Sequence, residues 1–167
     1  MHKYKLTSLA LSLIVASFLA AEITSGRAHA ENTQAGSTEG RLLQLLEKSG
    51  YKYTKVSDGV WEVPATGENI KNFGIRLATA DEIVLALVKL ADRKDLIIKE
   101  AFLLKMLELN HNFDSAKMAL SEEMLYVRID IHARLLDEEE LKYLIEQIAN
   151  ATDEAYPHIK GFIAGAK

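Results

Sequence analysis

Six consecutive apolar residues, Ile83–Val88, limit the folds open to this chain more than any other feature. Periodicity alone would permit a helix here. The run is short, however, holds three β-branched side chains and follows the turn-forming pair Asp81-Glu82, so it predicts a strand. A strand without a polar side needs cover on both faces, or on most of both. We therefore expect a central strand of a sheet that packs against helices.

Alternating apolar and polar residues predict the other strands. The clearest alternation covers residues 125–132, where Tyr126, Arg128, Asp130 and His132 fall on one side. Weaker alternation marks residues 51–56, 60–63, 73–78 and 116–120. Between the first two of these, Asp58-Gly59 fits the two positive-φ positions of a tight hairpin turn. Pro64 should end the second or mark an edge.

Three segments predict helices. The first contains Leu42, Leu43, Leu45 and Leu46, with Ser37 or Thr38 as N-cap and Gly50 as its left-handed stop. The second covers residues 92–110, capped by Asp92 or Asp95. Its residues at helical spacing are Ile97, Ala101, Leu104 and Leu107 or Glu108, and Ile98, Phe102 and Leu103 widen this apolar stripe.

The third helix starts after Asp137, which with Glu140 forms a capping-box-like pair. Its buried stripe should be Leu141, Leu144, Ile145, Ile148, Thr152 and Ala155. Pro157 should end it, and residues 161–167 should be a loose tail. These elements predict an α+β fold, an antiparallel sheet of about five to six strands with N-terminal, middle and C-terminal helices.

The first thirty residues have the three parts of a secretory signal peptide. Lys3 and Lys5 precede the uncharged run Leu6–Ala21, and Ala28-His29-Ala30 supplies a cleavage site after Ala30. A retained membrane anchor is the alternative, but the run reaches only about 24 Å of the about 30 Å that a bilayer core needs. We expect residues 1–30 to be a signal peptide, 31–39 a flexible leader and 40–163 the domain. The mature protein would be periplasmic or extracellular, without stable membrane insertion.

Composition excludes several classes of activity. Residues 1–30 contain three basic residues and one acidic residue, so their removal changes the net charge from −4 to −6, which disfavours nucleic-acid binding. The chain has no cysteine. His111, His132 and His158 lack metal-ligand spacing, and neither a nucleophile motif nor a phosphate-binding loop is present. We therefore predict no catalytic residues, no metal and no cofactor.

Several segments resemble the YbjN-like domain, which is also labelled a bacterial sensory transduction regulator. They are LLQLLEKSGYKY at Leu42–Tyr53, DGVWEVP at Asp58–Pro64, LLKMLELNHNFDSAKMAL at Leu103–Leu120 and YVRIDIHARLLDEEEL at Tyr126–Leu141. The resemblance spans Leu42 to Phe162. It implies a fold similar to type III secretion chaperones and a small, often dimeric, non-catalytic module. Its chaperone relatives bind extended polypeptide segments.

The function we expect is an exported, non-enzymatic protein-interaction module, chaperone-like or regulatory, that forms a homodimer and binds an unidentified protein partner. Tyr126, Arg128, Asp130 and His132 are the predicted partner-binding surface, since Tyr and Arg are enriched at interfaces. An ordinary polar strand face, or burial of Tyr126 under a helix, is the competing interpretation. The alternative function is a small apolar-ligand-binding protein of the cell envelope. The apolar surplus of Ile97–Leu107 would then line a pocket between helices and sheet.

Overall fold

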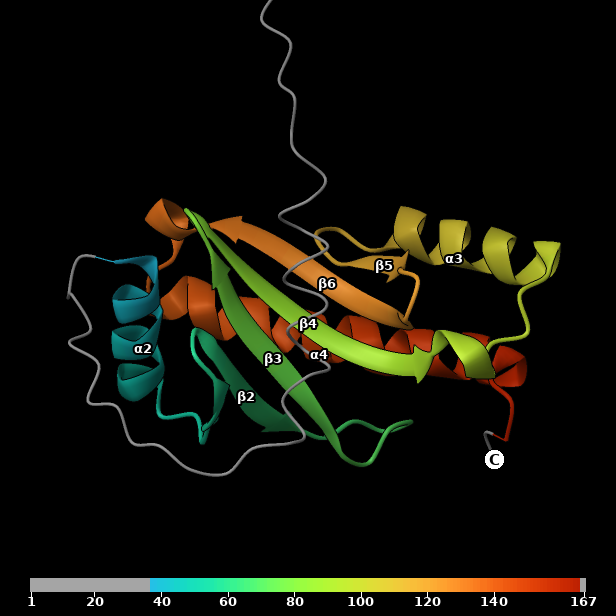
Figure 1. Cartoon of the computed structure of the whole chain (residues 1–167), viewed down its shortest axis with the longest axis horizontal. Coiled ribbons are helices and arrows are strands. Elements are labelled where there is room, and N and C mark those ends of the chain that lie inside the picture. The colour runs from blue at the N-terminus through green and yellow to red at the C-terminus, as the bar shows by residue number, and fades with distance from the viewer. Residues whose placement is uncertain (1–36, 166–167) are drawn as a thin grey trace, which may run out of the picture. The chain divides into compact units, whose positions relative to one another are not determined.

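A six-stranded antiparallel sheet organises the chain, which the computed structural model describes over residues 37–165 (Figure 1). The strands lie in the order β1-β2-β3-β4-β6-β5. Their bounds are β1 Thr54–Ser57, β2 Val60–Ala65, β3 Phe73–Ala80, β4 Ile83–Asp92, β5 Lys117–Leu120 and β6 Met124–His132. The expected signal peptide, residues 1–30, and leader residues 31–36 lie outside the described residues.

Three helices contribute to one hydrophobic core with the sheet. They are α2 Thr38–Ser49, α3 Glu100–Asn112 and α4 Glu138–Ile159. In Figure 1, α4 runs behind the sheet, α2 stands at one end of it and α3 lies beyond β5. This confirms the predicted α+β class. None of the helices within residues 37–165 is both long enough and apolar enough to cross a bilayer.

Strand β4 occupies the central position that its apolar run predicts. It pairs with β3 on one side and with β6 on the other. Val84, Ala86 and Val88 belong to the core that the helices share, and Leu85 and Leu87 alternate with them. All five side chains are buried. Both faces of this strand are shielded from water, which explains why its sequence is apolar without interruption.

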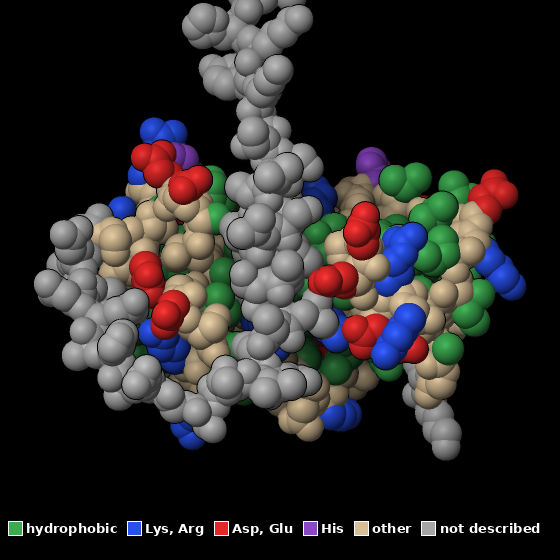
Figure 2. All heavy atoms as spheres, viewed as in Figure 1, with side chains coloured by type: hydrophobic (Ala, Val, Ile, Leu, Met, Phe, Trp, Pro, Cys, Tyr) green, Lys and Arg blue, Asp and Glu red, His purple; other side chains and the backbone are tan. Residues whose placement is uncertain are grey.

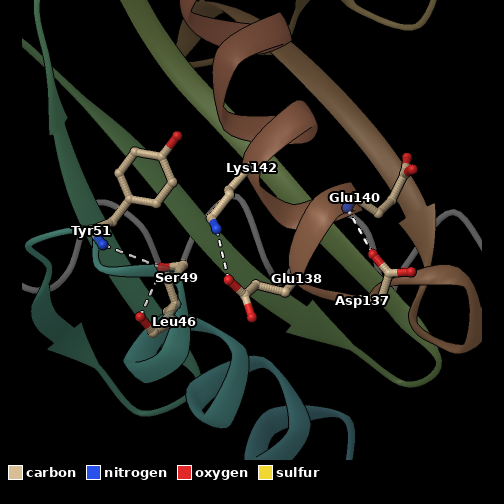
Figure 3. A network of polar contacts seen from close by, with 7 residues as sticks. All are labelled: Leu46, Ser49, Tyr51, Asp137, Glu138, Glu140 and Lys142. Atoms are coloured by element: carbon tan, nitrogen blue, oxygen red, sulfur yellow. Dashed lines mark hydrogen bonds and ion pairs between the residues drawn. The ribbon is translucent and has the colours of Figure 1, made fainter.

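Helices α2 and α4 begin where the sequence predicts. The Ser37 hydroxyl accepts a hydrogen bond from the N–H of Gly40 (3.0 Å). The Asp137 carboxylate accepts one from the N–H of Glu140 (2.8 Å; Figure 3). Gly50 ends α2 in the left-handed conformation, with φ of 79°. Because α2 starts at residue 38, the last two residues of the expected leader belong to this helix.

The turn between β1 and β2 differs in one detail from the prediction. Gly59 has a positive φ of 68°, but Asp58 does not share that conformation. The ladder instead shifts register between Lys55 and Ser57, which takes up one residue. Pro64 lies within β2, beyond Glu62, the last β2 residue that pairs with β1. Pro64 has no N–H to donate, but β1 is not paired with β2 at this position, so no hydrogen bond to β1 is lost.

The middle helix starts later than the sequence predicts. Asp92 still belongs to β4, and Arg93–Asp95 forms a short 3-10 turn. Helix α3 begins only at Glu100, and no side chain caps it, so neither Asp92 nor Asp95 has the predicted capping role.

The C-terminal tail explains the late start of α3 and is not loose where it is described. Leu96 forms an isolated antiparallel bridge with Ile163. The N–H of Ile97 donates to the carbonyl of Phe162 at 2.8 Å. The Phe162 ring lies 5.5 Å from the Phe102 ring. The segment before α3 is extended because it pairs with this tail.

Pro157 lies inside α4 and does not end it. A proline has no N–H to offer the carbonyl four residues earlier, which here is that of Asp153. The side-chain amide of Asn69, in the β2–β3 loop, donates to this carbonyl at 3.1 Å. The helix continues to Ile159 because the Asn69 side chain donates to the carbonyl that would otherwise lack a hydrogen-bond donor.

Candidate functional site

The largest group of exposed apolar side chains among the described residues lies on α3 and the segment before it. Its members, which we call the α3 surface, are Ile97 (43% exposed), Ile98 (40%), Leu103 (45%), Leu104 (52%) and Leu107 (65%). Figure 2 shows hydrophobic side chains gathered at the end of the molecule where α3 lies. Contiguous exposed apolar side chains of this kind mark interaction sites.

The α3 surface includes most of the apolar stripe that the sequence marks on this helix, and within that stripe only Phe102 is buried. The side chains of α3 that reach the core are Phe102, Met106 and Leu109. Apolar residues occupy more than one side of this helix, and packing against the tail and β5 decides which side is buried. The apolar surplus therefore faces outward and does not line the pocket on which the ligand-binding alternative depended.

Contacts at both ends hold α3 in place. Near its start, the Phe102 ring packs against Phe162 at an interplanar angle of 59°. Near its end, the Asn110 side chain donates to the carbonyl of Met118 (3.1 Å) and accepts from the N–H of Met118 (2.6 Å), which fixes the helix to β5. The leucines of the α3 surface thus stand on an anchored helix, and binding there costs little ordering entropy.

The four residues of the predicted partner-binding surface all lie on β6, but they differ in accessibility. Tyr126 is buried, with 6% of its surface exposed. Arg128 Nε donates to Asp130 Oδ1 at 2.9 Å. His132 Nε2 lies 3.1 Å from a carboxylate oxygen of Glu82, at the turn between β3 and β4. Three of the four side chains are therefore engaged in local pairs, and partner binding by this row stays a prediction.

The electrostatics of Arg128 support a structural role for its pair. Burial lowers the pKa of its guanidinium, but hydrogen bonds and charge interactions with Asp130 and Tyr126 raise it by more. The net direction is upward, so the group stays charged. A cation that is half withdrawn from water needs such partners.

The remaining candidates for chemistry have local roles. The Ser121 hydroxyl donates to the carbonyl of Met124 and accepts from the N–H of Glu123, as a turn residue does. His111 is exposed at the end of α3, on a different element from His132. Within residues 37–165, no three His, Asp or Glu side chains converge as metal ligands would.

Tyr51, two residues after the end of α2, lies within reach of the charges of Glu146 and Lys142 on α4 (Figure 3). Burial raises the pKa of the Tyr51 hydroxyl, Glu146 raises it further and Lys142 lowers it. Lys142 Nζ donates to a carboxylate oxygen of Glu138, one turn away, at 2.6 Å. The Tyr51 hydroxyl is therefore harder to ionise than a free phenol, and the nearby lysine is paired with Glu138.

The β2–β3 loop is fastened to α4 by Asp153, a contact that sequence reasoning missed. The Asp153 carboxylate accepts hydrogen bonds from three successive backbone N–H groups, of Glu68 (3.0 Å), Asn69 (2.8 Å) and Ile70 (2.9 Å). A Cβ at the preceding residue, Gly67, would lie 2.1 Å from Asp153 Oδ1, so glycine is needed there. We call this arrangement the Asp153 clasp.

The fold is that of YbjN and of type III secretion chaperones, as the resemblance of the sequence implied. No protein-family model and no curated protein matches the sequence itself.

Three solved structures illustrate the likeness. YbjN from E. coli is 15% identical, with a TM-score of 0.54 over 71% of this chain and 91% of its own. A chain of the ExsC–ExsE complex is 13% identical, with a TM-score of 0.51 over 72% of this chain and 92% of its own. A chain of the heterodimeric ExoU–SpcU complex, from the type III secretion system of Pseudomonas aeruginosa, is 15% identical, with a TM-score of 0.51 over 71% of this chain and 97% of its own.

Proposed function

We propose that the chain is an exported, non-enzymatic protein-interaction module of the chaperone-like or regulatory kind, and that the α3 surface joins two copies into a homodimer. The observation that carries this proposal is the set of five exposed apolar side chains, three on a helix fixed at both ends and two on the segment before it. Two of the structurally similar chains come from complexes of two proteins, which supports protein binding as the activity.

A second copy is the occupant that the α3 surface fits best. Leu103, Leu104 and Leu107 lie within two turns of one helix, so two such helices can pack across a twofold axis with the same leucines on both sides. Burying a leucine that is half exposed contributes about 1 kcal/mol. Ten such side chains in a dimer contribute about 10 kcal/mol, which is comparable with the cost of association, about 4–15 kcal/mol. We therefore expect a dimer that dissociates on dilution.

Light scattering after size exclusion tests the dimer with a matched pair of variants. Leu107→Glu places a charge in the α3 surface, whereas Leu135→Glu changes a leucine of similar exposure (59%) outside it. We expect the wild type and Leu135→Glu to be dimeric at high concentration and Leu107→Glu to be monomeric with an unchanged circular dichroism spectrum. A monomeric wild type at high concentration would refute the proposal, as would equal dissociation of both variants.

Export and partner binding need separate measurements. Expression of the full chain with a C-terminal tag, followed by fractionation and N-terminal sequencing, should give a mature protein that begins at Glu31 outside the cytoplasm. An uncleaved chain in the cytoplasm would contradict export.

Arg128→Ala tests the predicted partner-binding surface on β6. This variant should weaken partner binding and leave the dimer intact. Unchanged partner binding would remove this row of β6 residues from the proposal.

A further inference from the structure

The exposed side of α3 carries an acidic residue at one end and a histidine at the other. Residues on the side opposite the core recur at spacings of four, three and four, the repeat of a single helix stripe. They are Glu100, Leu104, Leu107 and His111, and all four are exposed. Phe102, Met106 and Leu109 hold the other side of the helix in the core. The two leucines therefore lie between a carboxylate and an imidazole.

The Glu100 and His111 side chains have neither a hydrogen bond nor an ion pair within residues 37–165. They cannot pair with each other in one copy, because eleven residues of helix at 1.5 Å per residue separate them by about 16 Å. Each side chain is therefore free to pair with a group of a second molecule.

The charged residues on the elements around His111 do not engage it. From α3, the loop after it, β5 and α4, they are Glu108, Asp114, Lys117 and Glu154. Glu108 is ion-paired with Lys105. Lys117 Nζ donates to the carbonyl of Phe113 at 3.3 Å. Asp114 and Glu154 line a hollow between the end of α3 and α4, to which His111 does not contribute.

The charges at the two ends of the stripe select one direction for a pair of α3 helices. If the helices were parallel, Glu100 would face Glu100 of the second copy, and His111 would face His111, so like groups would oppose each other. In the antiparallel arrangement, each Glu100 faces His111 of the other copy, and Leu104 packs against Leu107 of the other copy. The antiparallel pair is therefore complementary along the whole stripe.

We propose that two copies of this chain join through antiparallel α3 helices, and that a Glu100–His111 pair between the copies closes each end of the leucine contact and makes the dimer tighter in mild acid. This inference rests on the proposed function, because it gives the arrangement and the regulation of that dimer.

The direction of the pH effect follows from the chemistry of the pair. Imidazole side chains gain their positive charge as the pH falls from about 8 to about 5, whereas glutamate stays ionised over most of that range. A histidine that faces a carboxylate in the dimer holds its proton more tightly there than in the monomer. The contribution of the pair is therefore present in mild acid and is lost as the pH rises.

Sedimentation equilibrium of the full chain at pH 5.5 and pH 8 measures this effect. Two solvent-exposed ion pairs should lower the Kd of the dimer about fivefold at pH 5.5 relative to pH 8. His111→Asn should remove most of this difference. His132→Asn is the matched control, since His132 lies on β6 beyond the part that pairs with β5. The control should keep the wild-type difference, and it accounts for the general loss of negative charge in acid.

A rearrangement of charges tests which residues meet. His111→Glu places two carboxylates at each end of the antiparallel stripe, so it should weaken the dimer about fivefold at pH 8. Adding Glu100→Lys to His111→Glu should restore the affinity and abolish the difference between pH 5.5 and pH 8. This rescue must act between copies, because the two positions are too far apart within one helix. Circular dichroism checks that the variants keep their helices.

The inference is overturned if His111→Asn keeps the wild-type pH dependence, or if Glu100→Lys does not rescue the dimer that His111→Glu weakens. In either case, a wild-type dimer that Leu107→Glu still disrupts would leave the proposed function standing. A wild type that is monomeric at both pH values refutes the dimer and this inference together.

Discussion

Replacing Asp153 by alanine removes the acceptor for three main-chain hydrogen bonds of the clasp. A hydrogen bond to a charged group contributes about 1.5–3 kcal/mol when withdrawn from water, and these bonds are partly exposed, so we take about 1 kcal/mol each. Alanine returns up to about 0.7 kcal/mol because it is the better helix former. The free energy of unfolding should therefore fall by about 2 kcal/mol.

Urea unfolding followed by circular dichroism measures this loss. Glu154→Ala is the matched control, since it changes the adjacent acidic residue, which is exposed. The control should stay within about 0.5 kcal/mol of the wild type. If Asp153→Ala were as stable as the control, the clasp would not hold the loop to α4.

The same contact predicts a pH dependence. Burial raises the pKa of Asp153, but hydrogen bonds from Ile70, Asn69 and Glu68 lower it by more, so its folded pKa lies below the ordinary value. The clasp then contributes fully above the unfolded carboxyl pKa of about 3.9 and is lost as the pH falls through the depressed folded value. The stability difference between wild type and Asp153→Asn should shrink over that acidic range. A difference independent of pH there would contradict the charge-based account.

Four other substitutions test the packing and the capping of the helices. Thr152→Val should raise the free energy of unfolding by about 1 kcal/mol, because it removes a buried hydroxyl without a hydrogen-bonding partner; a loss in urea unfolding would mean that the hydroxyl has an unseen partner. Leu109→Ala should lower the free energy of unfolding by about 3 kcal/mol, whereas Leu107→Ala, on the exposed side of α3, should change that of the monomer by less than about 0.5 kcal/mol. Equal losses for the two variants would contradict the burial of Leu109 and the exposure of Leu107. Asp137→Ala should cost about 1 kcal/mol by removing the N-cap of α4, and thermal unfolding checks this loss, which an unchanged melting temperature would refute.

The sequence predicted an element correctly where nearby residues determine the local conformation. Asp137 caps α4, Gly50 ends α2 in a left-handed conformation, and the apolar run Ile83–Val88 forms the central strand. In each case the sequence signal lies within a few residues of the conformation that it predicts. The class of the fold followed from these elements together with the resemblance to the YbjN-like domain.

Predictions failed where distant residues decide the outcome. The orientation of α3 depends on Phe162, about sixty residues after Phe102 in the sequence, and the apolar pattern of the helix alone does not choose a side. The continuation of α4 past Pro157 depends on Asn69. The β3–β4 ladder stops at Arg76↔Leu87 although both strands continue, and no residue pattern signals where it stops. The candidate site was therefore less predictable than the fold.

The position of Trp61 has a practical consequence. It is the single tryptophan of the chain, it lies on β2 with 2% of its surface exposed, and it belongs to the core that all three helices share. Its fluorescence should shift to longer wavelengths when that core opens to water. The protein therefore carries its own optical reporter, and the stability variants can be compared without attaching a dye.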